Sequence, residues 1–174
     1  MVAAFLASNH LDVFFLSRFT GPADIASFGI SYLVFSTFIQ LPILAGVLLQ
    51  PYLVTLTLVQ PHRRTGTVFD SFLQTFTFAS SLAAIALAAA GSKLVPMIFG
   101  SGYEVSGMFL WPLMAAAAFA APVLFAWIPA AAALEKSYFL AVHAGVAGAM
   151  NVLLNWLLIP QFGVTGCLWA TVLS

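Results

Sequence analysis

The chain has 174 residues, of which 63% are hydrophobic and only 6% are charged, and its formal net charge is zero. A soluble domain carries roughly a quarter of its residues as charged ones, so this sequence lacks the polar side chains to cover a water-facing surface. Five basic residues are balanced by five acidic ones, which excludes the basic surface that nucleic-acid binding requires. The composition predicts an integral membrane protein whose partners are membrane lipids and not nucleic acid.

Breaks in the apolar sequence divide the chain into about six predicted spanning helices, because one span needs about 20 apolar residues. In chain order they are expected at 1–19, 25–49, 68–90, 105–133, 138–158 and from 164 to the end. The stretch 91–104 is predicted to be a short re-entrant or interfacial connection. The predicted fold is therefore an all-α polytopic membrane protein in which residues 1–174 form a single six-helix transmembrane lobe.

The predicted helices contain prolines, and the last helix is short. Pro42, Pro112, Pro122 and Pro129 each remove a backbone hydrogen bond, which predicts bent helices, either mobile or fixed. A terminal helix of about 11 residues is too short to cross a core of about 30 Å at 1.5 Å per residue. We therefore expect the chain to be a piece of a longer protein, the alternative being a short chain whose last helix stops part way.

Lysine and arginine residues in the predicted loops indicate the orientation. Arg63, Arg64 and Lys136 fall on one side of the membrane, and Arg18 and Lys93 fall on the other. The excess of basic residues favours a cytoplasmic location for the loop with Arg63 and Arg64, and this places Met1 on the same side. The arginine pair either only fixes the topology or also binds anionic lipid headgroups.

The sequence predicts neither an enzyme nor a cofactor or metal site. It contains no GxSxG, no nucleotide-binding loop with its lysine, no HExxH and no pair of carboxylates in one expected cavity. His10, His62 and His143 fall in three separate elements, and Cys167 has no second cysteine to share a metal. We interpret Cys167 as a small packing residue.

Polar residues inside the first apolar helix are its main functional signal, since each is costly unless it is paired or faces water. They include Asn9, Asp12 and Arg18. Asp12 shares a helix face with Ser8, and it is either a cation or proton site in a polar cavity or a partner of a neighbouring helix. Arg18 either lies near an anionic headgroup or extends its side chain to the membrane interface.

The last two helices carry a second set of polar and small residues. Asn151 and Asn155 are four residues apart and share one helix face. They either line a substrate cavity or form hydrogen bonds between helices. The turn 159–163, with Pro160, is expected to end the fifth helix, and Gly166 with Ala170 offers a small-residue surface for close packing.

Four motifs occur in a fixed order along the chain. They are D-x4-S-R-F-x2-P-A-D-x2-S-F-G-I-x2-L from Asp12, L-P-x7-Q-P from Leu41, P-M-I-F-G-x2-Y-x2-S from Pro96 and N-x3-N-x2-L-I-P-Q-F-G-V-x-G-x3-A-T from Asn151. This order resembles one lobe, the C-terminal one, of the O-antigen type polysaccharide flippases. These belong to the multidrug/oligosaccharidyl-lipid/polysaccharide exporter superfamily.

The resemblance implies a protein of twelve to fourteen helices in two lobes around a central cavity. The second lobe would lie in the same chain or in a partner chain. The implied function is to flip a lipid-linked oligosaccharide for polysaccharide biosynthesis across the inner (plasma) membrane, by alternating access coupled to H⁺ or Na⁺. The candidate cavity residues are Asn9, Asp12, Arg18, Asn151 and Asn155.

Three alternatives stay open beside this function. A lipid II flippase of the same superfamily would contain more cavity arginines than this sequence, in which Arg18 is the one helical candidate. A multidrug/toxic-compound extruder would use a carboxylate-centred cavity with Asp12 essential. A six-helix membrane assembly protein would not transport at all.

Overall fold

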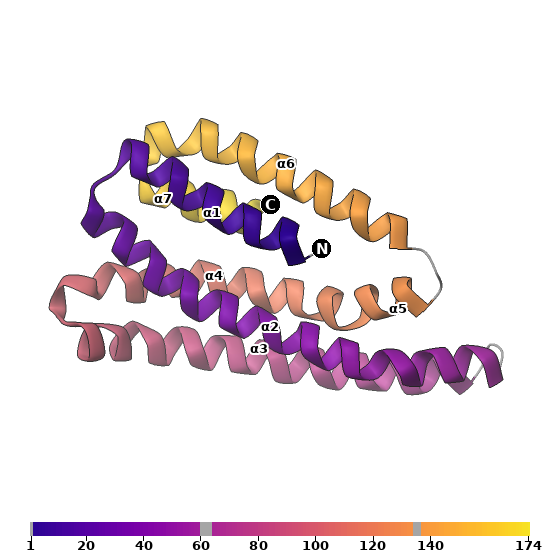
Figure 1. Cartoon of the computed structure of the whole chain (residues 1–174). Helices are drawn as coiled ribbons and strands as arrows, with labels where there is room; N and C mark the ends of the chain where they lie inside the picture. Colours follow the sequence, from indigo (N-terminus) through magenta and orange to yellow (C-terminus); the bar gives the residue numbers. More distant parts are fainter. Residues whose placement is uncertain (1, 60–63, 134–136) are drawn as a thin grey trace.

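The structure is a computed structural model that describes residues 2–59, 64–133 and 137–174, with side chains for 11–52, 54–55, 70–132 and 138–174. Within these ranges the chain is helical and contains no strand (Figure 1). The elements are α1 (Val2–Phe19), α2 (Pro22–Val59), α3 (Arg64–Phe99), the 3₁₀ turn η1 (Ser101–Tyr103), α4 (Glu104–Pro122), the π-helical segment η2 (Val123–Trp127), α5 (Ile128–Ala133), α6 (Ser137–Phe162) and α7 (Val164–Leu173). The predicted all-α fold is confirmed.

Four helical stretches are long and apolar enough to cross a membrane. They are Pro22–Tyr52, Asp70–Phe99, Ser101–Ala132 and Tyr138–Phe162. The protein is therefore a polytopic membrane protein, as its composition predicts. The first and last predicted spans correspond to α1, with 18 residues, and α7, with 10 residues. At 1.5 Å per residue α7 covers about 15 Å, or half of the hydrocarbon core.

The third span continues to Phe99, so the connection, predicted as re-entrant or interfacial from residue 91, is shorter than expected and begins only at Gly100. α3 runs through Gly91 to Phe99, and only Gly100 and η1 separate it from α4. Gly91 and Gly107 serve close packing instead of breaking a helix. A Cβ at Gly107 would lie 2.9 Å from the backbone of Ser92, so α3 and α4 approach each other closely here.

Two predicted helix ends are also wrong, both at prolines. α2 passes through Pro51 and ends at Val59, and α6 passes through Pro160 and ends at Phe162. A proline removes one hydrogen bond, and in a membrane the neighbouring helices tolerate such a break. The turn after α6 is made by Gly163, whose φ of 56° is a left-handed conformation that glycine adopts without strain.

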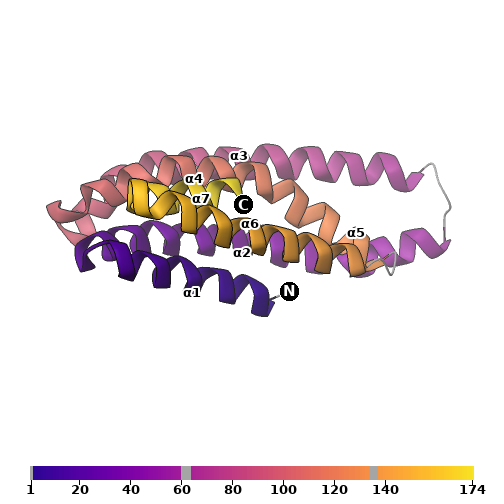
Figure 2. The same ribbon diagram turned by 90° about the horizontal axis from the view of Figure 1, so that it is seen from above.

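The helices form two groups that lie side by side (Figures 1 and 2). α3 packs on α4 and α4 on α2, whereas α7 packs on α6 and α6 on α1. The connections at Gly21, Gly100 and Gly163 lie at one end of the bundle, which we call the turn end. α5 ends and α6 begins at the other end, which we call the opposite end.

The fourth predicted span is one continuous but bent helix, formed by α4, η2 and α5. Pro122 and Pro129 lie on either side of η2. Because prolines lack an amide donor, they disturb the regular hydrogen bonding of the helix between them, and a single π-helical turn accommodates the change. The predicted bend is therefore observed, and it is located at Val123–Trp127.

Candidate functional site

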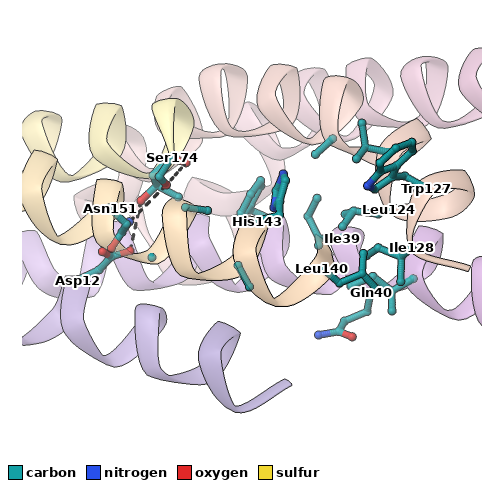
Figure 3. A pocket seen from close by; sticks show the side chains of 18 of the residues that line it. Asp12, Ile39, Gln40, Leu124, Trp127, Ile128, Leu140, His143, Asn151 and Ser174 are labelled. Carbon is teal, nitrogen blue, oxygen red and sulfur yellow. Dashed lines mark hydrogen bonds between the residues drawn. The ribbon is translucent and has the colours of Figure 1, made fainter. Parts of the chain in front are cut away.

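Three predicted cavity residues meet in one buried cluster between α1, α6 and α7. The exposed fraction is 2% for Asp12, 5% for Asn151 and 0% for Asn155. Thr171 of α7 joins them, and we call these four residues the polar cluster. Asp12 and Asn151 point toward each other beneath Ser174 (Figure 3).

Hydrogen bonds connect all members of the polar cluster. Asn155 Nδ2 donates both to Asp12 Oδ1 and to Asn151 Oδ1, the latter at 3.0 Å. The Thr171 hydroxyl lies 3.3 Å from Asp12 Oδ2 and 3.0 Å from the Cys167 carbonyl oxygen. Asn151 Nδ2 donates to Ser174 Oγ at 3.5 Å. The described donors to the carboxylate are therefore neutral groups.

Among the side chains that the structure describes, the polar cluster has an uncompensated negative charge and an unpaired hydrogen-bond acceptor. A carboxylate taken out of water loses several kcal/mol of solvation, which neutral amides recover only in part. Within the described part of the chain, Asn155 Oδ1 has no hydrogen-bond partner, and a buried unpaired acceptor costs about 1–3 kcal/mol. A bound cation or proton would compensate the charge of the Asp12 carboxylate and offer a partner to Asn155 Oδ1.

The atoms of the polar cluster suit a small hard cation, because such ions prefer carboxylate, amide and hydroxyl oxygens. Asn155 presents its Nδ2 to Asp12. Its terminal amide torsion is broad and two-fold, so a half-turn would present Oδ1 instead. Clusters of three or more His, Cys, Asp or Glu side chains, which would suit a transition metal, do not occur among the residues described.

A cavity of about 350 Å³ extends from the polar cluster toward the opposite end (Figure 3). Asp12 and Asn151 lie at one end of it, His143 lies about midway, and Gln40 and Trp127 lie toward the other end. Thr171 also lines the cavity. The walls between them are mostly apolar. They are formed by Tyr32, Phe35, Ile39, Ile43, Ala120, Val123, Leu124, Ile128, Leu140, Ala144, Ala147 and Gly148.

The other predicted site residues are not brought into this cluster. Arg18 is exposed on the last turn of α1. Asn9 lies in α1 and Arg64 begins α3, but the structure describes only the backbone of these two residues. Arg63 lies outside the described residues. Asp12 pairs with neighbouring helices, as one of its two predicted alternatives states, and it also lines the cavity. A cation or proton site at Asp12 stays a prediction.

Sequence reasoning missed Thr171, His143 and Gln40 as parts of the site. Thr171 has a recognisable signal, because it follows Gly163 by eight residues and Asn155 precedes Gly163 by eight. In a helical hairpin, residues at equal distances from the turn lie at equal depth. A polar residue opposite Asn155 is therefore expected from the position of the turn.

Comparison with models of known protein families, with curated proteins and with solved structures gives no match. The assignment of function therefore depends on the geometry of the polar cluster and on the motifs of the sequence.

Proposed function

We propose that the chain is one lobe of a cation-coupled membrane exporter that works by alternating access. Its coupling cation, Na⁺ or a proton, binds at the polar cluster. The observation that carries this proposal is the Asp12 carboxylate, which is 2% exposed and, among the side chains that the structure describes, accepts hydrogen bonds from neutral groups. The unpaired Asn155 Oδ1 beside it supports the same conclusion.

A cation at this position can change the arrangement of the helices because its ligands come from three of them. Asp12 lies on α1, Asn155 on α6 and Thr171 on α7. A ligand shifts a conformational equilibrium only by the difference in its affinity for the two states. A cluster shared by three helices has that property, since it loses ligands when one helix moves away. If the bend at η2 is mobile and not fixed, it gives a neighbouring helix the flexibility that such a movement needs.

The proposed cargo is a lipid-linked oligosaccharide, carried across the inner (plasma) membrane for polysaccharide biosynthesis. The motifs that begin at Asp12 and Asn151 support this part of the proposal. Arg18 is an exposed guanidinium at the turn end, and a guanidinium binds phosphate oxygens through two parallel hydrogen bonds. It is therefore the residue that we propose for contact with a pyrophosphate-linked headgroup.

The test is transport by the whole protein in proteoliposomes, with a fluorescent lipid-linked oligosaccharide as the cargo. One arm varies the Na⁺ gradient at constant pH, and the other varies the pH gradient at constant Na⁺. We expect one gradient to drive flipping and Asp12→Asn to lower the driven rate at least tenfold. Asp24→Asn is the matched control, because Asp24 is an exposed carboxylate at the start of α2. Equal driven rates in the wild type and Asp12→Asn would overturn the proposal.

A multidrug/toxic-compound extruder is the second candidate, favoured by one observation. The cavity has apolar and aromatic walls, including Trp127, and the Asp12 carboxylate at its end, which suits a lipophilic cation. Export of ethidium that requires Asp12, without flipping of the oligosaccharide, would select this candidate. Lipid II as a third cargo distinguishes the lipid II flippase, and no flux of any cargo would favour an assembly protein.

A further inference from the structure

An apolar layer separates the polar cluster from the turn end. It consists of Leu16, Phe28, Ile159 and Cys167, each at most 1% exposed, which pack together as one hydrophobic cluster. Each of the four lies four residues, or about 6 Å, closer to the turn end than a polar residue of the same helix. The pairs are Asp12 with Leu16, Tyr32 with Phe28, Asn155 with Ile159, and Thr171 with Cys167.

The opposite side of the polar cluster opens into the cavity. His143, Ala147 and Asn151 are spaced four residues apart on α6 and line the cavity together. The distance along the helix from His143 to Asn151 is about 12 Å. A cavity of 350 Å³ has room for on the order of ten water molecules. The small side chain of Ala147 helps to leave this space between the two polar positions.

Two polar residues line the cavity away from the polar cluster, at a similar depth along their helices. Gln40 follows Gly21 by 19 residues, and His143 precedes Gly163 by 20, so both lie about 30 Å from the turn end along their helices. Both are exposed, whereas Asp12 and Asn151 are buried. A depth of about 30 Å equals the thickness of the hydrocarbon core, so both side chains lie near its far boundary, where water is available.

We propose that in the conformation described the polar cluster is accessible from the opposite end only. The cation exchanges between Asp12 and the opposite end through the cavity, past Ala147, His143 and Gln40, while the apolar layer closes the route to the turn end in this state of the transport cycle. This inference rests on the proposed function. Four packed side chains without a charged or amide group leave a cation no ligands along that route, so crossing the layer would cost the solvation of the ion.

The test measures which positions a membrane-impermeant, positively charged methanethiosulfonate reagent reaches from each side of sealed vesicles that contain the whole protein. Cys167, the one cysteine of this chain, reports on the apolar layer without mutation. Ala147→Cys in a Cys167→Ala background, with any cysteines outside this chain also replaced, reports on the cavity. Ser101→Cys marks the turn-end side, because Ser101 is exposed in η1. Ala149→Cys is the matched control, since Ala149 is exposed on α6 and does not line the cavity.

We expect Ala147→Cys to react only from the side opposite to that of Ser101→Cys. Cys167 should react from neither side because it is buried in the apolar layer. Ala149→Cys should react from neither side because its exposed position outside the cavity is expected to face lipid. Saturating Na⁺, or protons if they are the coupling ion, should slow the reaction at Ala147→Cys at least threefold. His143→Leu should slow it as well, by closing the polar entrance, whereas His143→Gln should leave it near the original rate.

Reaction of Ala147→Cys from the turn-end side or from neither side would overturn the inference, and so would reaction of Cys167. Reaction from the expected side without protection by either cation would support the access route and count against a cation site at Asp12. If Ala147→Cys does not fold, Ala144→Cys gives the same test, because Ala144 lines the same cavity.

Discussion

Asn155 of α6 donates from a single nitrogen to two acceptors, the carboxylate of Asp12 on α1 and the amide oxygen of Asn151 one turn away. Asp12 and Asn155 are separated by 143 residues in the sequence. This one amide therefore links the first described helix to the last helical hairpin through buried side chains.

Replacing the carboxylate should remove the response to the cation without unfolding the protein. Asp12→Asn keeps the shape of the side chain and removes a buried charge. A ligand present at 100 times its Kd stabilises the folded state by about 2.7 kcal/mol. We expect Na⁺ or acid to raise the unfolding temperature of the wild type, but not that of Asp12→Asn, when each is compared with choline at neutral pH. An equal rise in both proteins would contradict a cation site at Asp12.

The two asparagines should contribute unequally to stability. Asn155→Leu removes both donated hydrogen bonds and leaves the Asp12 carboxylate with one donor fewer, so we expect a loss of about 1–3 kcal/mol in unfolding free energy. Asn151→Leu removes one acceptor and a long contact to Ser174, so its loss should be about 1 kcal/mol or less, with unchanged cargo preference. Denaturant unfolding in detergent measures both. In Asp12→Asn, the effect of Asn155→Leu should shrink, because contacting residues are not additive.

Close packing of α7 on α6 should make Gly166 intolerant of a side chain. A Cβ at Gly166 would overlap the Leu158 carbonyl, whereas one at Gly145 would meet nothing within 4 Å. We expect Gly166→Ala to lower the unfolding free energy by about 1–3 kcal/mol. Gly145→Ala should be neutral or stabilising by up to about 1 kcal/mol, since alanine favours helix. Similar losses in the two variants would show that this helix contact is not as close as described.

The bend at η2 should depend on Gly46 of α2. A Cβ at Gly46 would lie 2.8 Å from the Phe125 carbonyl oxygen and 3.3 Å from Pro129 Cγ. Gly46→Ala should push η2 outward and lower the transport rate severalfold at normal expression. Gly29→Ala is the control on the same helix, because nothing lies within 4 Å of a Cβ there. Equal transport by both variants would separate the bend from the transport cycle.

Composition and buried polarity carried the sequence predictions that the structure confirms. An apolar chain with 6% charged residues leaves few folds other than membrane-spanning helices. Asp12, Asn151 and Asn155 stand out because amides and carboxylates inside apolar helices require partners. The sequence does not say which helices supply those partners, since that depends on how the helices pack.

Thr171 illustrates why the rest of the site was not predicted. Its hydroxyl can donate to the Cys167 carbonyl of its own helix, as Thr20, Thr37 and Thr77 do to their preceding turns. A threonine hydroxyl in a membrane helix can therefore form its hydrogen bond within its own helix, so the sequence gives no indication that it has a partner on another helix. Pro160 misleads for the opposite reason, because it is a strong helix breaker in water and lies inside α6.

The closeness of α7 to α6 at Gly166 divides the polar cluster into two halves. Asn155 and Thr171 stand on the two arms of one tight hairpin, so their separation is nearly fixed. Asp12 stands on α1, which is joined to this hairpin by side chains and not by a short turn. The cluster thus has a rigid half on the hairpin and a half on α1 that can move separately. A cation bound between the two halves would hold α1 against the hairpin, and its loss would allow α1 to tilt.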